Sequence, residues 1–500
     1  MTKLKGLNFL CICCFLFLSS SKPSDDGVLN IVAGTAKITG KITRPNNTSK
    51  DNIYVKITVP HQITGEYVNY EAVVDQSGKF SIDVDVETTV SLIRFHTSVN
   101  TDKALLLKLK SGDVTQIDIV YNSDSDIENI KVTPDMNKND MDRCFNLIGE
   151  MIMIQTLPGK TPEPLHKMSP DYFLNYINTI LSERLAVVNN DTLISKELKE
   201  VLYNEARLFT YREAVFAYTG EMKEDHSKDK ESYVQKIDRS FYHFLKDFKL
   251  NNPQHLYAFS FLEFQGKILQ NEILALPKVG ESDVRSWLVQ VKAILSDLLG
   301  FNDGPYYDIL AANAYGRQLT EELRPFSERQ KENIRNYWKD GEIAKILLRK
   351  NQQIVELDKS KWPVVVNDIS SIADDKVMET IAAKHKGKVV LIDLWATWCV
   401  PCLNAMKEFR STKNEFHDKD VVFVYLTNGS SPKELWEEKI KGIGSEHYYL
   451  KDTQWKYMME HFAFKGIPSY ILYNKDGALI NKFTGFPGND KVKKMINDLL

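Results

Sequence analysis

The chain has 500 residues, more than a single hydrophobic core normally supports, and this length suggests about three domains. Its 64 lysines and arginines nearly balance its 67 aspartates and glutamates, and the resulting net charge of −3 argues against a nucleic-acid-binding protein. Hydrophobic residues make up 43% and charged residues 26%, which is typical of soluble globular proteins and not of disordered, collagen-like or polytopic membrane chains.

The chain begins with a segment typical of an export signal. The apolar run 7–18 follows two lysines, precedes three serines and is too short to span a membrane comfortably. We interpret residues 1–21 as a signal peptide, rather than as a buried helix of the folded protein, and expect an exported protein of the periplasm or cell envelope. Cys11, Cys13 and Cys14 lie in this leader, so a lipid anchor is an alternative to cleavage, although no small-residue pattern precedes these cysteines.

Residues 30–125 predict a small antiparallel β-sandwich. Short β-rich runs alternate with turn signals such as Asp75-Gln76-Ser77-Gly78, at a spacing of about eight to twelve residues. This region contains no recognisable catalytic cluster.

Residues 135–350 predict an all-helical region, because apolar side chains recur there with a period of 3.6 residues. Ser169 before Pro170 and the pair Ser327 and Gln330 mark helix starts. The aromatic stripes of this region, such as the phenylalanines at 241, 244 and 248, are interpreted as core. The expected helices cover 172–188, 196–218, 233–248 and 284–299, and the segments around Pro162 and Pro164 and at 221–230 are expected to be loops.

Residues 360–500 predict an α/β sheet with helices on both faces, since strands and helices alternate and a terminal hairpin follows. The expected helices are 374–385, 402–416, 432–440, 454–462 and one from 490; the expected strands are 389–395, 421–426, 447–450, 469–474 and 478–483.

Three cysteines lie outside the leader, too few for a disulfide-stapled scaffold. Cys144 is at helical spacing from Leu147 and Met151, which predicts a buried, unreactive thiol. The remaining pair, Cys399 and Cys402, is the candidate site.

The cysteine pair directly follows an apolar strand, in the string Trp395-Ala396-Thr397-Trp398-Cys399-Val400-Pro401-Cys402. A strand that leads into a helix places Cys399 at the helix N-terminus, where free N–H groups and the helix dipole favour a thiolate. We therefore predict that Cys399 is the nucleophile and that Cys402, within disulfide reach one turn later, is the resolving thiol. Pro401 is tolerated in this first turn because its missing N–H would have had no helical partner.

Two other kinds of cysteine site fit the sequence poorly. A structural zinc site needs two more Cys or His ligands at short spacing, and the nearby histidines form no such pair. A peroxidatic cysteine would act as a single reactive thiol, without a partner three residues further on.

Two further segments are candidates for the same site. Asp393 lies in the apolar strand before the motif, either at a sheet edge or buried near the thiols, where a raised pKa would let it exchange a proton with Cys402. Ile467-Pro468 precedes a strand, and an X-Pro bond there is either an ordinary trans bond or a cis bond that exposes the backbone of Ile467 to an extended substrate. We assign Trp398, Pro401, Ile467 and Pro468 to substrate binding.

The string GKVVLIDLWATWCVPC at 387–402, with Gly466-Ile467-Pro468 and the turn Lys475-Asp476-Gly477, resembles the TlpA/ResA-like periplasmic branch of the thioredoxin superfamily. The resemblance covers the C-terminal part of the chain. It implies a thioredoxin fold, Cys399 as attacking and Cys402 as resolving thiol, Asp393 at the buried-acid position, and Pro468 as a cis proline that faces the disulfide. The layout of leader, β region, helical region and thioredoxin domain is also similar to large exported thioredoxin-like proteins of Gram-negative bacteria.

These observations lead us to expect an extracytoplasmic thiol-disulfide oxidoreductase that reduces protein disulfides and receives electrons from an upstream donor protein. The redox-active disulfide Cys399–Cys402 would be its only redox group, with no metal and no bound cofactor. Net oxidation of substrates would use the same residues. A rival hypothesis is an envelope binding or scaffold protein, whose N-terminal regions recognise a partner and whose thioredoxin domain only docks.

Overall fold

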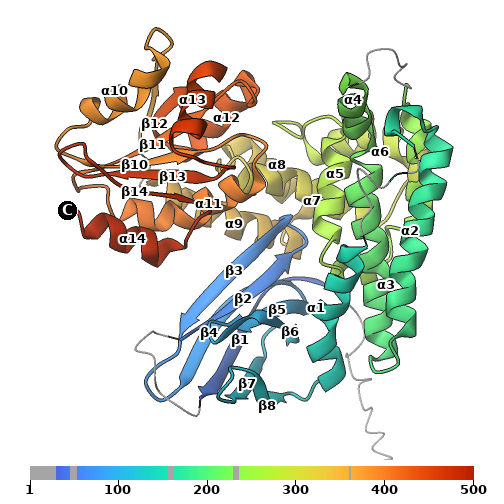
Figure 1. Ribbon diagram of the computed structural model, residues 1–500. Helices are drawn as coiled ribbons and strands as arrows, with labels where there is room; N and C mark the ends of the chain where they lie inside the picture. Colours follow the sequence, from blue (N-terminus) through green and yellow to red (C-terminus); the bar gives the residue numbers. More distant parts are fainter. Residues whose placement is uncertain (1–29, 45–52, 155–160, 162, 229–235, 360–361) are drawn as a thin grey trace, which may run out of the picture.

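The computed structural model describes residues 30–44, 53–154, 161, 163–228, 236–359 and 362–500, and three regions follow one another along this chain (Figure 1). The predicted signal peptide, residues 1–21, lies outside the described residues. Among the residues described, none of the helices combines the length and the apolar character needed to cross a membrane.

The N-terminal region consists of two four-stranded sheets, with strand orders β4-β1-β7-β8 and β3-β2-β5-β6. Side chains of both sheets, such as Ile38 and Phe95, form one hydrophobic core, as expected for a sandwich. The strands are β1 (Ile31–Thr43), β2 (Tyr54–His61), β3 (Glu66–Val73), β4 (Lys79–Thr88), β5 (Val90–Thr97), β6 (Asn100–Lys110), β7 (Val114–Tyr121) and β8 (Ile127–Thr133).

Two features of this region differ from the sequence prediction. Strands β1 and β7 are parallel, so a purely antiparallel sandwich is wrong at this pair. The reason is that the chain crosses to the other sheet between them, and a crossover, unlike a hairpin, can join parallel strands. Strand β8 was missed because it is an edge strand in which only Val132 is buried, so its side chains give no clear alternation.

The middle region is helical throughout its described part, and its start signals behave as predicted. Ser169 caps the helix that begins at Pro170, and Ser327 forms a capping box with Gln330. The α-helices are α1 (Lys138–Met153), α2 (Pro170–Asn190), α3 (Lys196–Thr210), α4 (Tyr218–Lys228), α5 (Phe261–Gln270), α6 (Val284–Leu299), α7 (Pro305–Thr320), α8 (Glu328–Trp338) and α9 (Glu342–Lys359). Shorter 3₁₀ helices cover Leu165–Lys167, Arg239–Phe248 and Pro253–Tyr257, and a π-helical turn covers Tyr211–Val215.

Several details of the helical region correct the prediction. The expected loop at 221–230 is largely the helix α4, whose polar sequence carries no apolar stripe and so hides its helical period. The expected helix at 196–218 is interrupted by the π-helical turn. Of the expected helix at 233–248, residues 233–235 lie outside the described residues and residues 239–248 form a 3₁₀ helix. The aromatic side chains of that stretch are buried in the core, as predicted, and Cys144 is fully buried and unpaired, with a pKa raised by burial.

The C-terminal region contains a six-stranded sheet of order β14-β13-β10-β11-β12-β9, in which β13 is antiparallel to both of its neighbours and the other pairs are parallel. Strand β9 was missed by the sequence analysis because it is short and pairs only with the distant β12. The strands are β9 (Val364–Asn367), β10 (Val389–Leu394), β11 (Val421–Thr427), β12 (Ser445–Tyr449), β13 (Ser469–Tyr473) and β14 (Leu479–Thr484).

Helices cover both faces of this sheet, as predicted (Figure 1). Helices α11, α12 and α14 contribute to the core on one face, and α10 and α13 contribute to the core on the other. The helices are α10 (Val377–Lys384), preceded by a 3₁₀ turn at Asp374–Lys376, α11 (Val400–Asn414), α12 (Lys433–Ile443), α13 (Asp452–His461) and α14 (Asn489–Asn497).

Candidate active site

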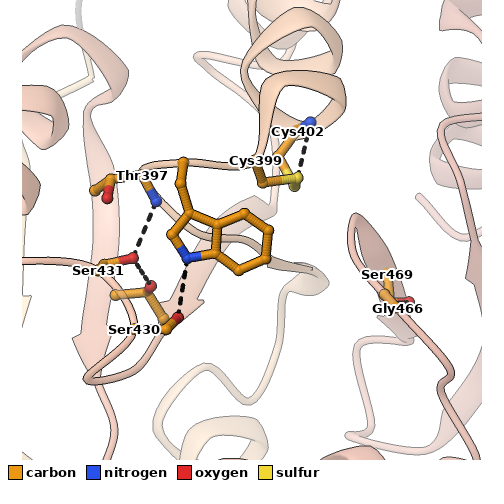
Figure 2. The surroundings of a disulfide bond; sticks show 9 residues. Thr397, Cys399, Cys402, Ser430, Ser431, Gly466 and Ser469 are labelled. Atoms are coloured by element: carbon orange, nitrogen blue, oxygen red, sulfur yellow. Dashed lines mark hydrogen bonds between the residues drawn. A yellow bond between two sulfur atoms is a disulfide. The ribbon is translucent and has the colours of Figure 1, made fainter. Parts of the chain in front are cut away.

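The cysteine pair lies where the buried central strand β10 leads into helix α11. Cys399 is the N-cap residue of α11, and its sulfur accepts a hydrogen bond of 3.2 Å from the backbone N–H of Cys402 (Figure 2). The two cysteines form a disulfide across the first helical turn, with their Cα atoms 5.3 Å apart. The free N–H groups and the positive end of the helix dipole are therefore directed at the sulfur that a reduced Cys399 would carry as a thiolate.

The two cysteines are buried, but two of their neighbours in the motif are exposed to solvent. Cys399 is 3% exposed and Cys402 is fully buried, whereas Trp398 is 61% exposed and Pro401 is also exposed. A partner that approaches over Trp398 thus reaches Cys399 before Cys402.

Asp393 lies in the sheet beneath helix α11. It is in register with Tyr425 of β11 and Tyr470 of β13, and all three side chains are on the face that α11 covers. Asp393 is 6% exposed, and burial raises its pKa well above the usual range, while the charge of Lys413 acts in the opposite direction. Asp393 is therefore a buried acid within the sheet and not an edge residue.

A cavity of about 10 Å³, enough for about one water molecule, borders Asp393, Tyr425, Tyr470 and Met406. Within the described part of the chain, Oδ1 of Asp393 and the hydroxyl of Tyr470 have no hydrogen-bond partner. Two unsatisfied polar groups at one small cavity are the arrangement that a buried water molecule satisfies.

Lys413 was missed from the sequence; it lies about three turns after Cys402 on the same helix. Its ammonium donates hydrogen bonds to the carbonyl of Ile443 (2.9 Å) and the hydroxyl of Tyr425 (3.2 Å). Burial lowers its pKa well below the usual range, the cation of Arg410 adds to this, and Asp393 opposes it. Lys413 stands at helical spacing from Cys402 and Phe409, so a lysine on the apolar face of α11 was the sequence signal for this residue.

The loop after β11 supports the motif and was also missed. Ser431 accepts a hydrogen bond of 3.0 Å from the backbone N–H of Thr397, and Ser430 accepts one of 3.3 Å from the indole of Trp398 (Figure 2). Ser430 in turn donates to Asn428 at 2.8 Å. Strands β10 and β11 are parallel neighbours, so the loops at their carboxyl ends meet, and the polar string after β11 was the signal that identifies this loop.

The predicted segment Ile467-Pro468 lies opposite the disulfide. Figure 2 shows its flanking residues Gly466 and Ser469 across from the two cysteines. The Ile467–Pro468 peptide bond is cis, and the hydroxyl of Ser469 closes the segment by donating to the carbonyl of Gly466 at 2.7 Å. Ile467 is partly exposed and Pro468 is buried. The structure thus brings every sequence-predicted site residue to the same end of the sheet or directly beneath it.

Known proteins match the C-terminal region. A family model described as thioredoxin-like matches residues 387–479. Sporulation thiol-disulfide oxidoreductase A of Bacillus subtilis (strain 168) is 27% identical over 104 residues, which are 20% of this chain and 62% of that protein. ResA of the same strain is 25% identical over 115 residues, which are 23% of this chain and 61% of that protein.

Among solved structures, the thioredoxin domain of a thiol-disulfide oxidoreductase from Bacteroides vulgatus is 26% identical and matches 23% of this chain and 84% of that one, with a TM-score of 0.21. The chain spans somewhat less than two thirds of the length of these two curated relatives. The C-terminal part of the chain is a thioredoxin-like domain, similar to the domains of ResA-like thiol-disulfide oxidoreductases.

Proposed function

We propose that the protein is a thiol-disulfide oxidoreductase of the periplasm or cell envelope that reduces disulfide bonds in protein substrates. The observation that carries the proposal is the disulfide-bonded cysteine pair at the N-terminus of α11, with a buried acid in the sheet that α11 covers. The leader-like residues 1–21 support the location, and the resemblance to the TlpA/ResA-like branch supports reduction over oxidation.

In the proposed reaction the reduced protein attacks first through Cys399. Its thiolate forms a bond to one sulfur of the substrate disulfide, the substrate S–S bond breaks, and the departing substrate thiolate takes a proton from water. Cys402 then loses its proton to Asp393 and attacks Cys399. The Cys399–Cys402 bond forms as the mixed disulfide between Cys399 and the substrate breaks, and the departing substrate thiolate takes up the proton held by Asp393. The substrate leaves with both sulfurs reduced, and an upstream donor protein returns two electrons and two protons to the Cys399–Cys402 disulfide.

The other predicted residues have roles in holding the substrate. Trp398 offers an exposed apolar surface beside Cys399, and Pro401 extends that surface. The backbone of Ile467 before Pro468 would pair with an extended substrate segment next to the attacked disulfide.

We expect the protein to catalyse the reduction of insulin disulfides by dithiothreitol, and its cysteine couple to have a reduction potential in the reducing half of the range from about −270 to −120 mV known for this fold. The potential is measured by equilibration with glutathione or thioredoxin and mass spectrometry of alkylated protein. A potential near −120 mV would mean that the protein oxidises its substrates instead of reducing them. Absence of insulin reduction would contradict the oxidoreductase activity itself.

The contact of Ser430 with the Trp398 indole predicts a separate effect on substrate binding. Ser430→Ala removes one hydrogen bond, worth about 1 kcal/mol, so we expect KM for insulin to rise about fivefold while kcat stays within about twofold. Ser370→Ala changes an exposed serine of the same domain and serves as the control. A fall in kcat at unchanged KM would show that Ser430 acts on the thiol chemistry instead.

A further inference from the structure

A turn of the N-terminal β region reaches into the helical region and ends beside α11, the helix that carries Cys402, which we call the redox helix. This β2–β3 turn runs from His61 to Glu66, and its residue Ile63 is fully buried in the hydrophobic core of the helical region. It is therefore a place where side chains of all three regions meet.

The β2–β3 turn is fixed by buried hydrogen bonds from two sides. The carboxylate of Glu87 on β4 accepts hydrogen bonds from the backbone N–H groups of Ile63 (2.6 Å) and Thr64 (3.2 Å). Asn313 of α7 donates to the carbonyl oxygens of Gln62 (2.8 Å) and Ile63 (2.9 Å). Because these bonds are buried, moving the turn would leave several polar groups without partners. Glu66, at the end of the turn, consequently has a fixed position.

Glu66 joins the other two regions through its carboxylate. It is 6% exposed and forms ion pairs with Lys350 of α9 and with Lys407 of α11, the helix that carries Cys402. Burial lowers the pKa of each lysine to about 8, opposed at Lys350 by the charges of Glu87 and Asp85. A desolvated ammonium requires a counter-charge, and Glu66 is the carboxylate that both lysines contact.

The thioredoxin-like domain meets the rest of the chain at a second helix as well. Glu438 of α12 lies 3.7 Å from Lys278 of the helical region. A Cβ atom at Gly442 would lie 2.3 Å from the carbonyl oxygen of Glu322, so α12 approaches the helical region closely. Helices α11 and α12 are on the same face of the sheet, whereas Trp398 beside the disulfide is exposed. The contacts thus hold the domain by one face and leave Trp398, the residue before Cys399, exposed.

We propose that Glu66 is a positioning residue through which the N-terminal β region holds the redox helix α11. The thioredoxin-like domain then keeps one fixed orientation relative to the two N-terminal regions. This role goes beyond the proposed function and does not depend on the direction of electron flow. It assigns to the two N-terminal regions the task of a rigid support for the redox helix.

The test uses the full-length protein with a donor and an acceptor dye on unnatural amino acids at Val289 and Ile480, two exposed positions in the helical region and on β14. Single-molecule energy transfer should give one narrow distance distribution for the otherwise unchanged protein and for Glu66→Asp. Glu66→Gln should broaden the distribution or add a second population. The control Glu71→Gln removes an exposed carboxylate from the same strand and should leave the distribution narrow.

Lys407→Gln tests the same contact from the side of the redox helix, and it replaces Glu66→Gln if that variant does not fold. Because Glu66 acts on α11 through Lys407, the double variant should be no broader than Lys407→Gln alone. A narrow distribution in both single variants would overturn the proposal, and so would equal broadening by Glu71→Gln. Distances are measured without turnover, so the result stands apart from any loss of oxidoreductase activity.

Discussion

Cys402→Ser is expected to trap protein substrates as stable mixed disulfides on Cys399, whereas Cys399→Ser should neither turn over nor trap. Cys399 is the N-cap residue of α11 and the less deeply buried of the two cysteines, so we expect it to make the first bond to the substrate. Without Cys402 no internal thiol can release the substrate. Both variants should lose at least about 1,000-fold in insulin-reducing activity, because each removes a group that forms a covalent bond in the reaction.

The trapped species is measured by non-reducing electrophoresis and by mass spectrometry of the complex after incubation with insulin. The variant Cys399→Ser/Cys402→Ser is the control for non-covalent binding. It should form no complex with insulin that dithiothreitol separates by reduction. Trapping by Cys399→Ser at the level of Cys402→Ser would reverse the two thiol roles. An undiminished biological effect of the double variant would instead favour the scaffold hypothesis for this chain.

The parts of the fold that were predicted from sequence are those fixed by local chemistry. Strand β10 and helix α11 follow from an apolar run that leads directly into a Cys-x-Pro-Cys turn, and the structure places Cys399 at the helix N-terminus as expected. The caps at Ser169 and Ser327 and the helix 284–299 are equally local. In each case the pattern and the structure use the same few consecutive residues.

The parts that were missed depend on residues far apart in sequence. The parallel pairing of β1 with β7 and the addition of β9 beside β12 are set by how whole sheets assemble, which no local pattern encodes. The helix α4 was mistaken for a loop because its sequence is polar and carries no apolar periodicity. In the site, Ser430 became visible only once β10 and β11 were known to be parallel neighbours.

Asp393 was one of two site features with two open interpretations, and the structure decides between them through the burial of its side chain. A lone carboxyl in an apolar strand fits a sheet edge as well as an interior. The structure has β13 and β11 on either side of β10, so no edge exists at this position. The charge of Lys413, which opposes the effect of burial on the pKa of Asp393, lies on the covering helix α11, and no local pattern links it to Asp393.

Replacing Asp393 with asparagine should slow the second step of the reaction and stabilise the fold at neutral pH. Asparagine cannot accept the proton of Cys402, so we expect insulin reduction to fall at least about 10-fold at pH 7. The deficit should shrink as the pH rises above about 8.5, where an ordinary thiol ionises without a base. The measurement is the pH dependence of kcat, and Asp418→Asn, at a side chain that is 99% exposed, is the matched control.

Although Asp393→Asn is expected to lower the activity, it is expected to raise the stability of the folded protein at neutral pH. Burial raises the pKa of Asp393 in the folded protein above its unfolded value of about 3.9, so between these two values the folded state holds a proton that the unfolded state has released. The contribution of Asp393 to the free energy of unfolding is therefore fully present below about pH 4 and falls by about 1.4 kcal/mol per pH unit above it. Asparagine does not ionise, so the melting temperature of the variant, relative to the parent protein, should rise from pH 4 to pH 7 in calorimetry, with no such trend for Asp418→Asn. A constant difference across this range would mean that the pKa of Asp393 is not raised in the folded protein, because the charge of Lys413 then outweighs the effect of burial.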